Sequence, residues 1–99
     1  MKIIRELHTK SGSGKEKILL TAIIDEVKEA NTRSGKMAFL KLSDESGWIE
    51  CIVFPSHFSR FRKMLITGKH VEVYGLLNLV ETPKKLFLTD IKSSKERRP

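Results

Sequence analysis

Two alternating runs of residues, joined by a four-residue polar turn, constrain the fold of this chain most. In residues 37–43 and again in residues 48–54, every second position is apolar and suited to a core. Because successive side chains of a strand point to opposite faces, each run predicts a strand with one buried face. The turn Asp44-Glu45-Ser46-Gly47 joins them, and its glycine accepts a positive φ. The inward sets are Ala38, Leu40 and Leu42 in the first strand and Ile49, Cys51 and Val53 in the second.

The segments around this hairpin predict three more strands and one helix. Residues 18–29 are rich in Ile, Leu and Val. A helix competes there, but the missing N-cap favours a long, bent strand. Pro55 suits the first turn of a short helix that ends near Gly68, with Phe58, Phe61 and Leu65 inward and the basic Arg60, Arg62 and Lys63 in water. Residues 69–79 and 86–91 are predicted to form the fourth and fifth strands.

The element order βββαββ within 99 residues predicts one all-β domain, a five-stranded barrel with a short helix between strands three and four. Residues 11–14 read Ser-Gly-Ser-Gly, so residues 1–17 are interpreted as a flexible basic tail. Residues 18–92 then form the barrel, and residues 93–99 form a second basic tail.

The net charge of +7 is concentrated at the ends of the chain. Residues 1–17 hold five basic and two acidic side chains, and residues 92–99 hold four and one, so residues 18–91 carry only +1. Solvated tails and nonspecific attraction to phosphates both explain the ends. The N-terminus lacks a secretory signal, so we expect a cytoplasmic protein. One cysteine and three scattered histidines predict neither a disulfide nor a metal site, and no cofactor is expected.

Three runs of the sequence together carry a resemblance to a known family: residues 35–44, residues 46–55 and the stretch Val71-Glu72-Val73-Tyr74-Gly75. They resemble the OB (oligonucleotide-binding) domain of the bacterial DNA polymerase III alpha subunit. They also resemble, more distantly, the anticodon-binding OB domains of class II aminoacyl-tRNA synthetases. The resemblance implies a binding face on strands two and three, flanked by the loop after strand one and the loop between strands four and five.

On that face the resemblance places Phe39 where a base would stack, and Trp48 lies across the hairpin from it. Aromatic rings stack on unpaired bases and gain about 1–3 kcal/mol per base. The alternative is that both rings are buried under a tail or a partner protein. Glu50 either accepts from a base or pairs with Lys41 across the hairpin. The predicted nucleic-acid-binding residues are Phe39, Trp48, Lys41, Arg33, Lys36, Lys84, Lys85 and Glu50.

Catalytic motifs are missing from the sequence: residues 12–15 lack the spacing of a phosphate-binding loop, and no nucleophile or metal motif occurs. We therefore predict a non-enzymatic module that binds single-stranded DNA in replication or repair with little sequence preference. An RNA-binding domain and a protein-interaction or self-association module remain alternatives. The chain is either a domain of a larger enzyme or a small independent protein.

Overall fold

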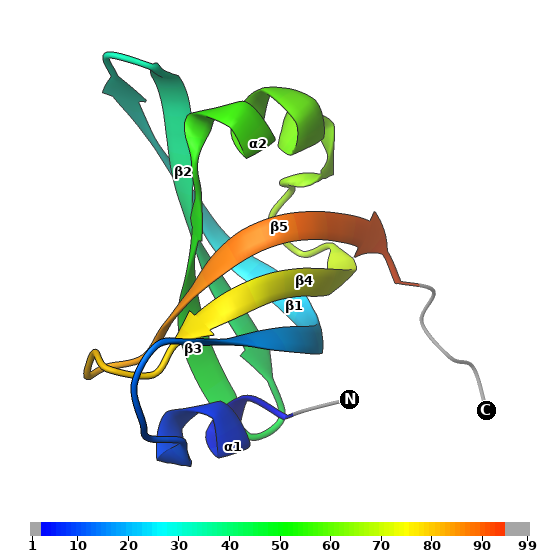
Figure 1. The fold of residues 1–99 in the computed structure, drawn as a ribbon. Helices are drawn as coiled ribbons and strands as arrows, with labels where there is room; N and C mark the ends of the chain where they lie inside the picture. The colour runs from blue at the N-terminus through cyan, green and yellow to red at the C-terminus, as the bar shows by residue number, and fades with distance from the viewer. Residues whose placement is uncertain (1–2, 95–99) are drawn as a thin grey trace, which may run out of the picture.

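The computed structural model describes residues 3–94 as five strands, two α-helices and one turn of 3₁₀ helix (Figure 1). The predicted order βββαββ is confirmed, with an additional helix in front of it. The elements are α1 (Ile4–Thr9), β1 (Lys15–Thr32), β2 (Gly35–Asp44), β3 (Gly47–Val53), α2 (Pro55–Phe61), η1 (Arg62–Met64), β4 (His70–Asn78) and β5 (Lys85–Ser93).

The five strands close into a ring in the order β1-β2-β3-β5-β4. Strand β1 makes the closure possible, because its first half pairs with β4 and its second half with β2. The pairing register shifts at Asp25, between Ile24 and Glu26, which is where the strand passes from one partner to the other. The long, bent first strand predicted from the sequence is therefore confirmed, and it runs three residues further at each end.

Strands β3 and β5 make the one parallel contact of the described ring, from Glu50 opposite Lys85 to Ile52 opposite Phe87. The other neighbours are antiparallel. The core fills the inside of the ring with apolar side chains from every strand. The inward faces predicted for β2 and β3 are confirmed: Ala38, Leu40, Leu42, Ile49, Cys51 and Val53 are all buried.

Gly75 sits where β4 and β5 approach each other closely. A Cβ atom at this position would lie 2.7 Å from the carbonyl oxygen of Phe87, well inside van der Waals contact. The register of β4 against β5 also shifts between Tyr74 and Gly75. The missing side chain therefore permits the irregular pairing that brings these two strands together.

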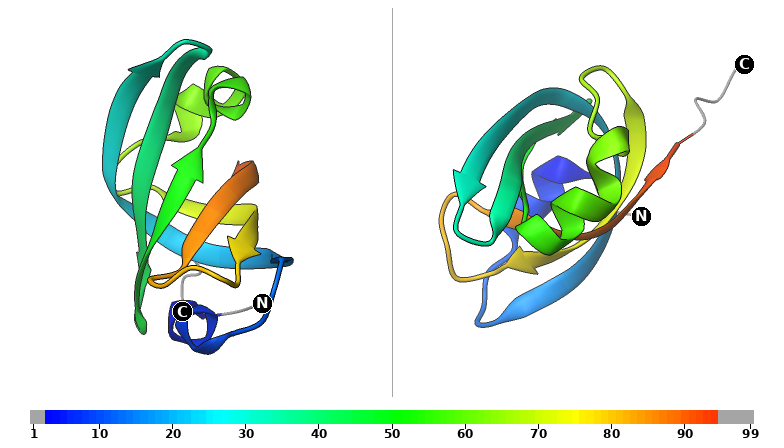
Figure 2. Two further views of the ribbon diagram at one scale, coloured as in Figure 1. Left: turned by 60° about the vertical axis from the view of Figure 1, so that its left-hand side comes forward. Right: turned by 90° about the horizontal axis from the view of Figure 1, so that it is seen from above.

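Helix α2 covers one end of the ring and α1 covers the other (Figures 1 and 2). Pro55 occupies the first turn of α2, as predicted. Phe58 and Leu65 are buried and Phe61 packs partly against the core, while Arg60, Arg62 and Lys63 are exposed. The predicted division of this helix into a core face and a solvated basic face is thus confirmed.

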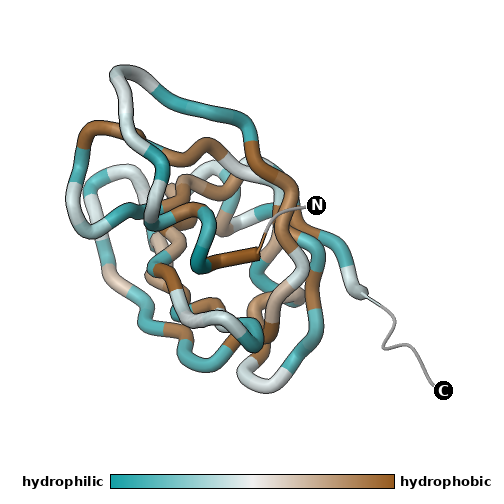
Figure 3. Tube along the Cα trace, turned by 90° about the horizontal axis from the view of Figure 1, so that it is seen from below, coloured by the Kyte–Doolittle hydropathy of each residue, from teal (hydrophilic) through white to brown (hydrophobic). Residues whose placement is uncertain are grey.

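The interpretation of residues 1–17 as a flexible tail is wrong for most of the part that the structure describes. Residues 4–9 form α1, and residues 15–17 already belong to β1. Ile4 and Leu7 are completely buried because they close the open lower end of the ring, across which the chain passes in Figure 3. A short helix with two apolar residues has no clear sequence period, so the pattern alone missed it. The predicted second tail begins at Ser93, which is the last residue of β5, and residues 95–99 lie outside the described residues.

The turn between β2 and β3 holds α1 in place through its backbone donors. The first N–H groups of a helix have no partner within the helix. Here the N–H of Ile4 donates to Oδ2 of Asp44 at 2.9 Å, and the N–H of Arg5 donates to Oγ of Ser46 at 2.9 Å. Burial acts to raise the pKa of Asp44, but the hydrogen bonds that it accepts from Ser46, Ile4 and Gly47 outweigh it, so the pKa lies below its ordinary value.

Candidate nucleic-acid interface

The outer face of β2 and β3 carries the two aromatic side chains that the sequence placed there. Phe39 is half-buried, and Trp48 is 55% exposed. In the register of the hairpin Phe39 faces Ile52, and Trp48 faces Ser43 four residues further along β2. Trp48 is therefore one of the few large apolar side chains that the fold leaves in solvent, and neither ring belongs to the fully buried core.

The charged residues of this face pair differently from the prediction. Lys41 and Glu50 are opposite each other in the register, as expected. The ammonium group of Lys41, however, lies 5.0 Å from the centroid of the Trp48 ring, a cation–π contact. The carboxylate of Glu50 forms its ion pair with Lys85 on β5, at 3.8 Å. The prediction did not include β5 as a parallel neighbour of β3, and this neighbour supplies the competing lysine.

A groove of about 640 Å³ runs over this face. It contains six of the eight predicted site residues and adds residues from β1, from α1 and from the loop between β4 and β5. The predicted residues in the groove are Phe39, Lys41, Trp48, Glu50, Lys84 and Lys85, and the additional ones are His8, Glu26, Lys28, Leu40, Gly47, Ile49 and Pro83.

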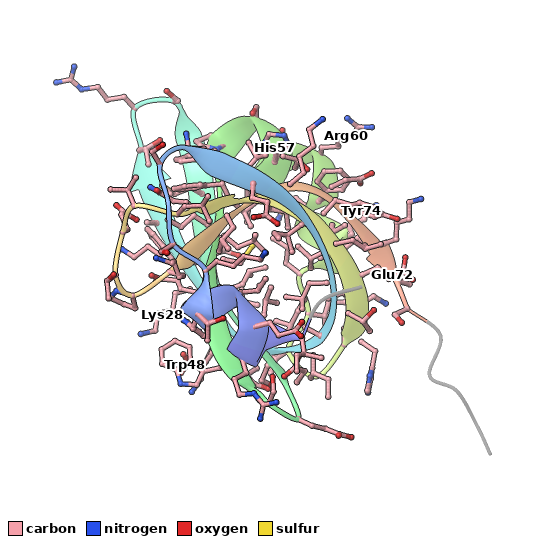
Figure 4. All side chains as sticks on the ribbon, turned by 60° about the horizontal axis from the view of Figure 1, so that its bottom comes forward. Lys28, Trp48, His57, Arg60, Glu72 and Tyr74 are labelled. Atoms are coloured by element: carbon pink, nitrogen blue, oxygen red, sulfur yellow. The ribbon has the colours of Figure 1, made fainter. Side chains whose placement is uncertain are left out.

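Lys28 is the added residue with the clearest chemical role. It lies on β1 directly opposite Phe39 in the strand pairing, and its side chain is exposed. A lysine beside a half-buried aromatic ring combines a positive charge with a stacking surface, the two features that bind a single strand. Figure 4 labels Lys28 and Trp48 on the same side of the ring. The sequence shows Lys28 as one of several basic residues, and only the strand register brings it to the groove.

Lys84 has a structural role rather than the free phosphate contact that was predicted for it. Its side chain is buried, with only 7% exposed, and its ammonium group donates to the carbonyl oxygens of Leu79 at 2.9 Å and Glu81 at 3.0 Å. A buried ammonium group needs such partners to offset its desolvation. Lys84 therefore fastens the loop between β4 and β5, while its neighbour Lys85 remains half-exposed in the groove.

Arg33 lies in the turn between β1 and β2, and Lys36 is the second residue of β2; neither of them lines the groove. The ammonium group of Lys36 is 3.5 Å from a carboxylate oxygen of Glu29, and both side chains are about half exposed, so the pair is weak. Lys36 lines a second depression next to α2, together with Arg62. Four basic residues were predicted to flank the aromatic rings. Lys84 and Lys85 line the groove, whereas Arg33 and Lys36 lie outside it.

Helix α1 contacts the groove through His8, which is one of the residues that line it. A ring nitrogen of His8, Nε2, lies 2.8 Å from the carbonyl oxygen of Trp48, which is hydrogen-bonding distance. The tryptophan backbone is therefore held between the β2–β3 turn and the helix. This contact links a segment interpreted as a tail to one of the two aromatic residues that the sequence placed on the binding face.

The described residues 3–94 contain neither a helix long and apolar enough to cross a membrane nor a group of three metal-ligating side chains. Cys51 is completely buried in the core, and burial raises the pKa of its thiol. A buried thiol of this kind is inert.

The closed five-stranded ring, with a helix between its third and fourth strands and an aromatic, basic groove on strands two and three, defines an OB fold of the nucleic-acid-binding type. Residues 18–93 match the tRNA anti-codon family model, described as an OB-fold nucleic acid binding domain. The chain belongs to this family, as the resemblance predicted.

A curated relative is the DNA polymerase III subunit alpha of Aquifex aeolicus, which is 36% identical over 61 residues. The match covers 61% of this chain and 5% of the polymerase subunit, so the chain spans about one-twentieth of that relative. The corresponding subunit of Bacillus subtilis is 38% identical over 55 residues, with 54% and 5% covered.

Solved structures share the fold at low sequence identity. The Stn1–Ten1 complex of S. pombe contains a similar chain with a TM-score of 0.74 and 13% identity, covering 95% of this chain and 76% of that one. The mitochondrial single-stranded DNA binding protein Rim1 of S. cerevisiae gives a TM-score of 0.64 and 20% identity, covering 85% of this chain and all of that one.

Proposed function

We propose that this protein binds single-stranded DNA in the groove over β2 and β3, as a module of DNA replication or repair. The observation that carries the proposal is Trp48, an indole ring 55% exposed on a sheet face, with Lys41 against it and Phe39 in the same groove. The similarity to a polymerase subunit and the fold shared with a single-stranded DNA binding protein support the choice of DNA.

Binding follows from the chemistry of the groove. Because the ammonium group of Lys41 occupies a place over the Trp48 ring, a base stacks on the free part of that ring or takes the place of the lysine. Each stacked base gains about 1–3 kcal/mol without reading its identity. Lys28, Lys41 and Lys85 then lie beside the strand and neutralise phosphates. Binding, and not catalysis, is the activity that we assign to this domain.

The test is a titration with short oligothymidylates, followed by the fluorescence of Trp48, the only tryptophan. We expect saturable quenching that weakens with salt. For three neutralised phosphates, the slope of log K against log salt concentration is about −2, from roughly −0.7 per phosphate on a single strand. Phe39→Ala should weaken binding by roughly 5- to 100-fold, the equivalent of one lost stack.

Tyr74→Leu provides the matched control. Tyr74 is also an outward-facing aromatic residue, with the ammonium group of Lys92 at 5.5 Å from its ring centroid, but it lies on β4, away from Trp48 (Figure 4). Its removal should leave the affinity unchanged. If the folded protein gives no quenching at low salt, or if Phe39→Ala and Tyr74→Leu behave alike, the groove is not the binding site. The exposed tryptophan would then be assigned to a contact with another protein.

RNA is the second candidate, because the matching family model is named for the tRNA anticodon. Competition between DNA and RNA oligonucleotides of one sequence measures the preference directly, since the 2′-hydroxyl is the difference that a site senses.

A further inference from the structure

A second aromatic cluster lies on the outside of the sheet where β3 runs into α2. The rings of Phe54 and Phe87 are stacked, with centroids 5.7 Å apart and planes at 14°. The ammonium group of Lys15, from the start of β1, lies 5.5 Å from the centroid of the Phe87 ring. Three segments far apart in the sequence thus form one contiguous group of two rings and a cation.

The strand register connects this cluster to the groove. Phe39 on β2 faces Ile52 on β3, and Ile52 faces Phe87 on β5. Neighbouring strands are about 4.8 Å apart, so Phe39 and Phe87 are separated by about 10 Å across the sheet. Lys85, which lines the groove, precedes Phe87 by two residues on the same face of β5. The cluster therefore continues the outer face on which the groove lies.

The distance along β3 from Trp48 to the second cluster is longer than one nucleotide. Trp48 and Ile52 are four residues apart, which is about 13 Å in a strand. A strand that stacks on Trp48 and continues across the face therefore reaches the second cluster only after several nucleotides. OB folds bind about 4–16 nucleotides, so this reach lies within what one such domain covers.

Phe54 is the accessible member of the cluster. Its side chain is 44% exposed, whereas Phe87 is partly covered by its neighbours. Only the backbone of Phe54 takes part in the start of α2, where its carbonyl oxygen accepts from the N–H groups of His57 and Phe58. The exposed part of the Phe54 ring therefore takes no part in core packing or in helix capping.

We propose that Phe54, supported by Phe87 and Lys15, is a second stacking position for the same bound strand. This inference rests on the function proposed above. A base stacks on the exposed ring of Phe54, and Lys15 lies beside the phosphates that lead to it. The bound strand then crosses from the Trp48 end of the groove over β3 toward β5.

The experiment measures affinity as a function of oligothymidylate length, from about 4 to about 16 nucleotides, with the fluorescence of Trp48 as the signal. In the wild type, affinity rises with length until the strand spans both positions. Phe54→Ala should leave the shortest oligonucleotides unaffected and weaken the long ones by roughly 5- to 100-fold. Phe54→Tyr should restore long-strand binding, and Phe54→Leu, which keeps apolar area without a ring, should not.

Ile66→Ala is the control, because Ile66 is another exposed apolar side chain, 55% accessible, in the segment before β4. Circular dichroism checks that each variant is folded. The inference is overturned if Phe54→Ala and Ile66→Ala give the same length dependence as the wild type. It is also overturned if Phe54→Ala leaves binding intact but abolishes a dimer in sedimentation, since the pair then serves a protein contact. Wild-type protein that binds no length at all contradicts the proposed function itself.

Discussion

Lys84 and Lys85 are adjacent in the sequence and have opposite environments in the fold. The sequence assigned both to phosphate binding because each is a lysine in the loop between the last two strands. In the structure the Lys84 ammonium group is held by two carbonyl oxygens, while Lys85 is half-exposed and forms an ion pair with Glu50. Lys84 immediately precedes β5 and its ammonium group is bound by carbonyl oxygens of the loop, whereas Lys85 is the first residue of the strand.

This contrast predicts separate effects for the two lysines. Lys84→Met should lower the free energy of unfolding by about 1–3 kcal/mol, because it removes charge-assisted hydrogen bonds to the carbonyls of Leu79 and Glu81. Lys85→Met should change that free energy by less than about 0.5 kcal/mol. Instead, in the Lys85→Met variant the slope of log K against log salt concentration for oligonucleotide binding should become shallower by about 0.7. Urea unfolding and salt titrations measure the two quantities, and a reversed pattern would mean that Lys84 contacts phosphate.

At the scale of elements, α1 shows how a short helix becomes part of a domain. Six residues are too few to be a stable helix in water, so its stability comes from the contacts that it makes. Ile4 and Leu7 fill the lower end of the ring, and Asp44 and Ser46 accept the helix donors. The family model starts at residue 18, so this helix is an addition to the matched core.

Leu7→Ala tests whether α1 is integral to the fold. Leu7 is completely buried, so the substitution should lower the free energy of unfolding by about 2–5 kcal/mol. Arg5→Ala on the same helix removes an exposed side chain and should cost less than about 0.5 kcal/mol. Chemical denaturation gives both values. Equal, negligible effects would restore the interpretation of this segment as a tail.

At the scale of the whole molecule, closure of the ring depends on how closely β4 and β5 approach. Gly75→Ala introduces a Cβ atom 2.7 Å from the carbonyl oxygen of Phe87, and a backbone carbonyl in a sheet cannot move aside cheaply. We expect a loss of about 1–3 kcal/mol or more in the free energy of unfolding. Thr67→Ala, at an exposed position before β4, is the neutral control. A Gly75→Ala protein as stable as the wild type would show that the two strands separate at this point without cost.

The sequence by itself determined the strand pattern, the short helix after Pro55 and the family. These features depend on side-chain alternation and on turn residues, which act over a few neighbouring positions. It also placed Phe39 and Trp48 on the outer face, because the same alternation that buries Leu40 and Ile49 turns them outward.

The tertiary structure decided everything that depends on which strands become neighbours. Because β3 lies parallel to β5, Glu50 forms its ion pair with Lys85 and not with Lys41. The pairing of β1 with β2 brings Lys28 beside Phe39. The docking of α1 likewise depends on an open barrel end that exists only when the ring is closed. Contacts between residues this far apart follow from the three-dimensional register, and local sequence patterns do not encode that register.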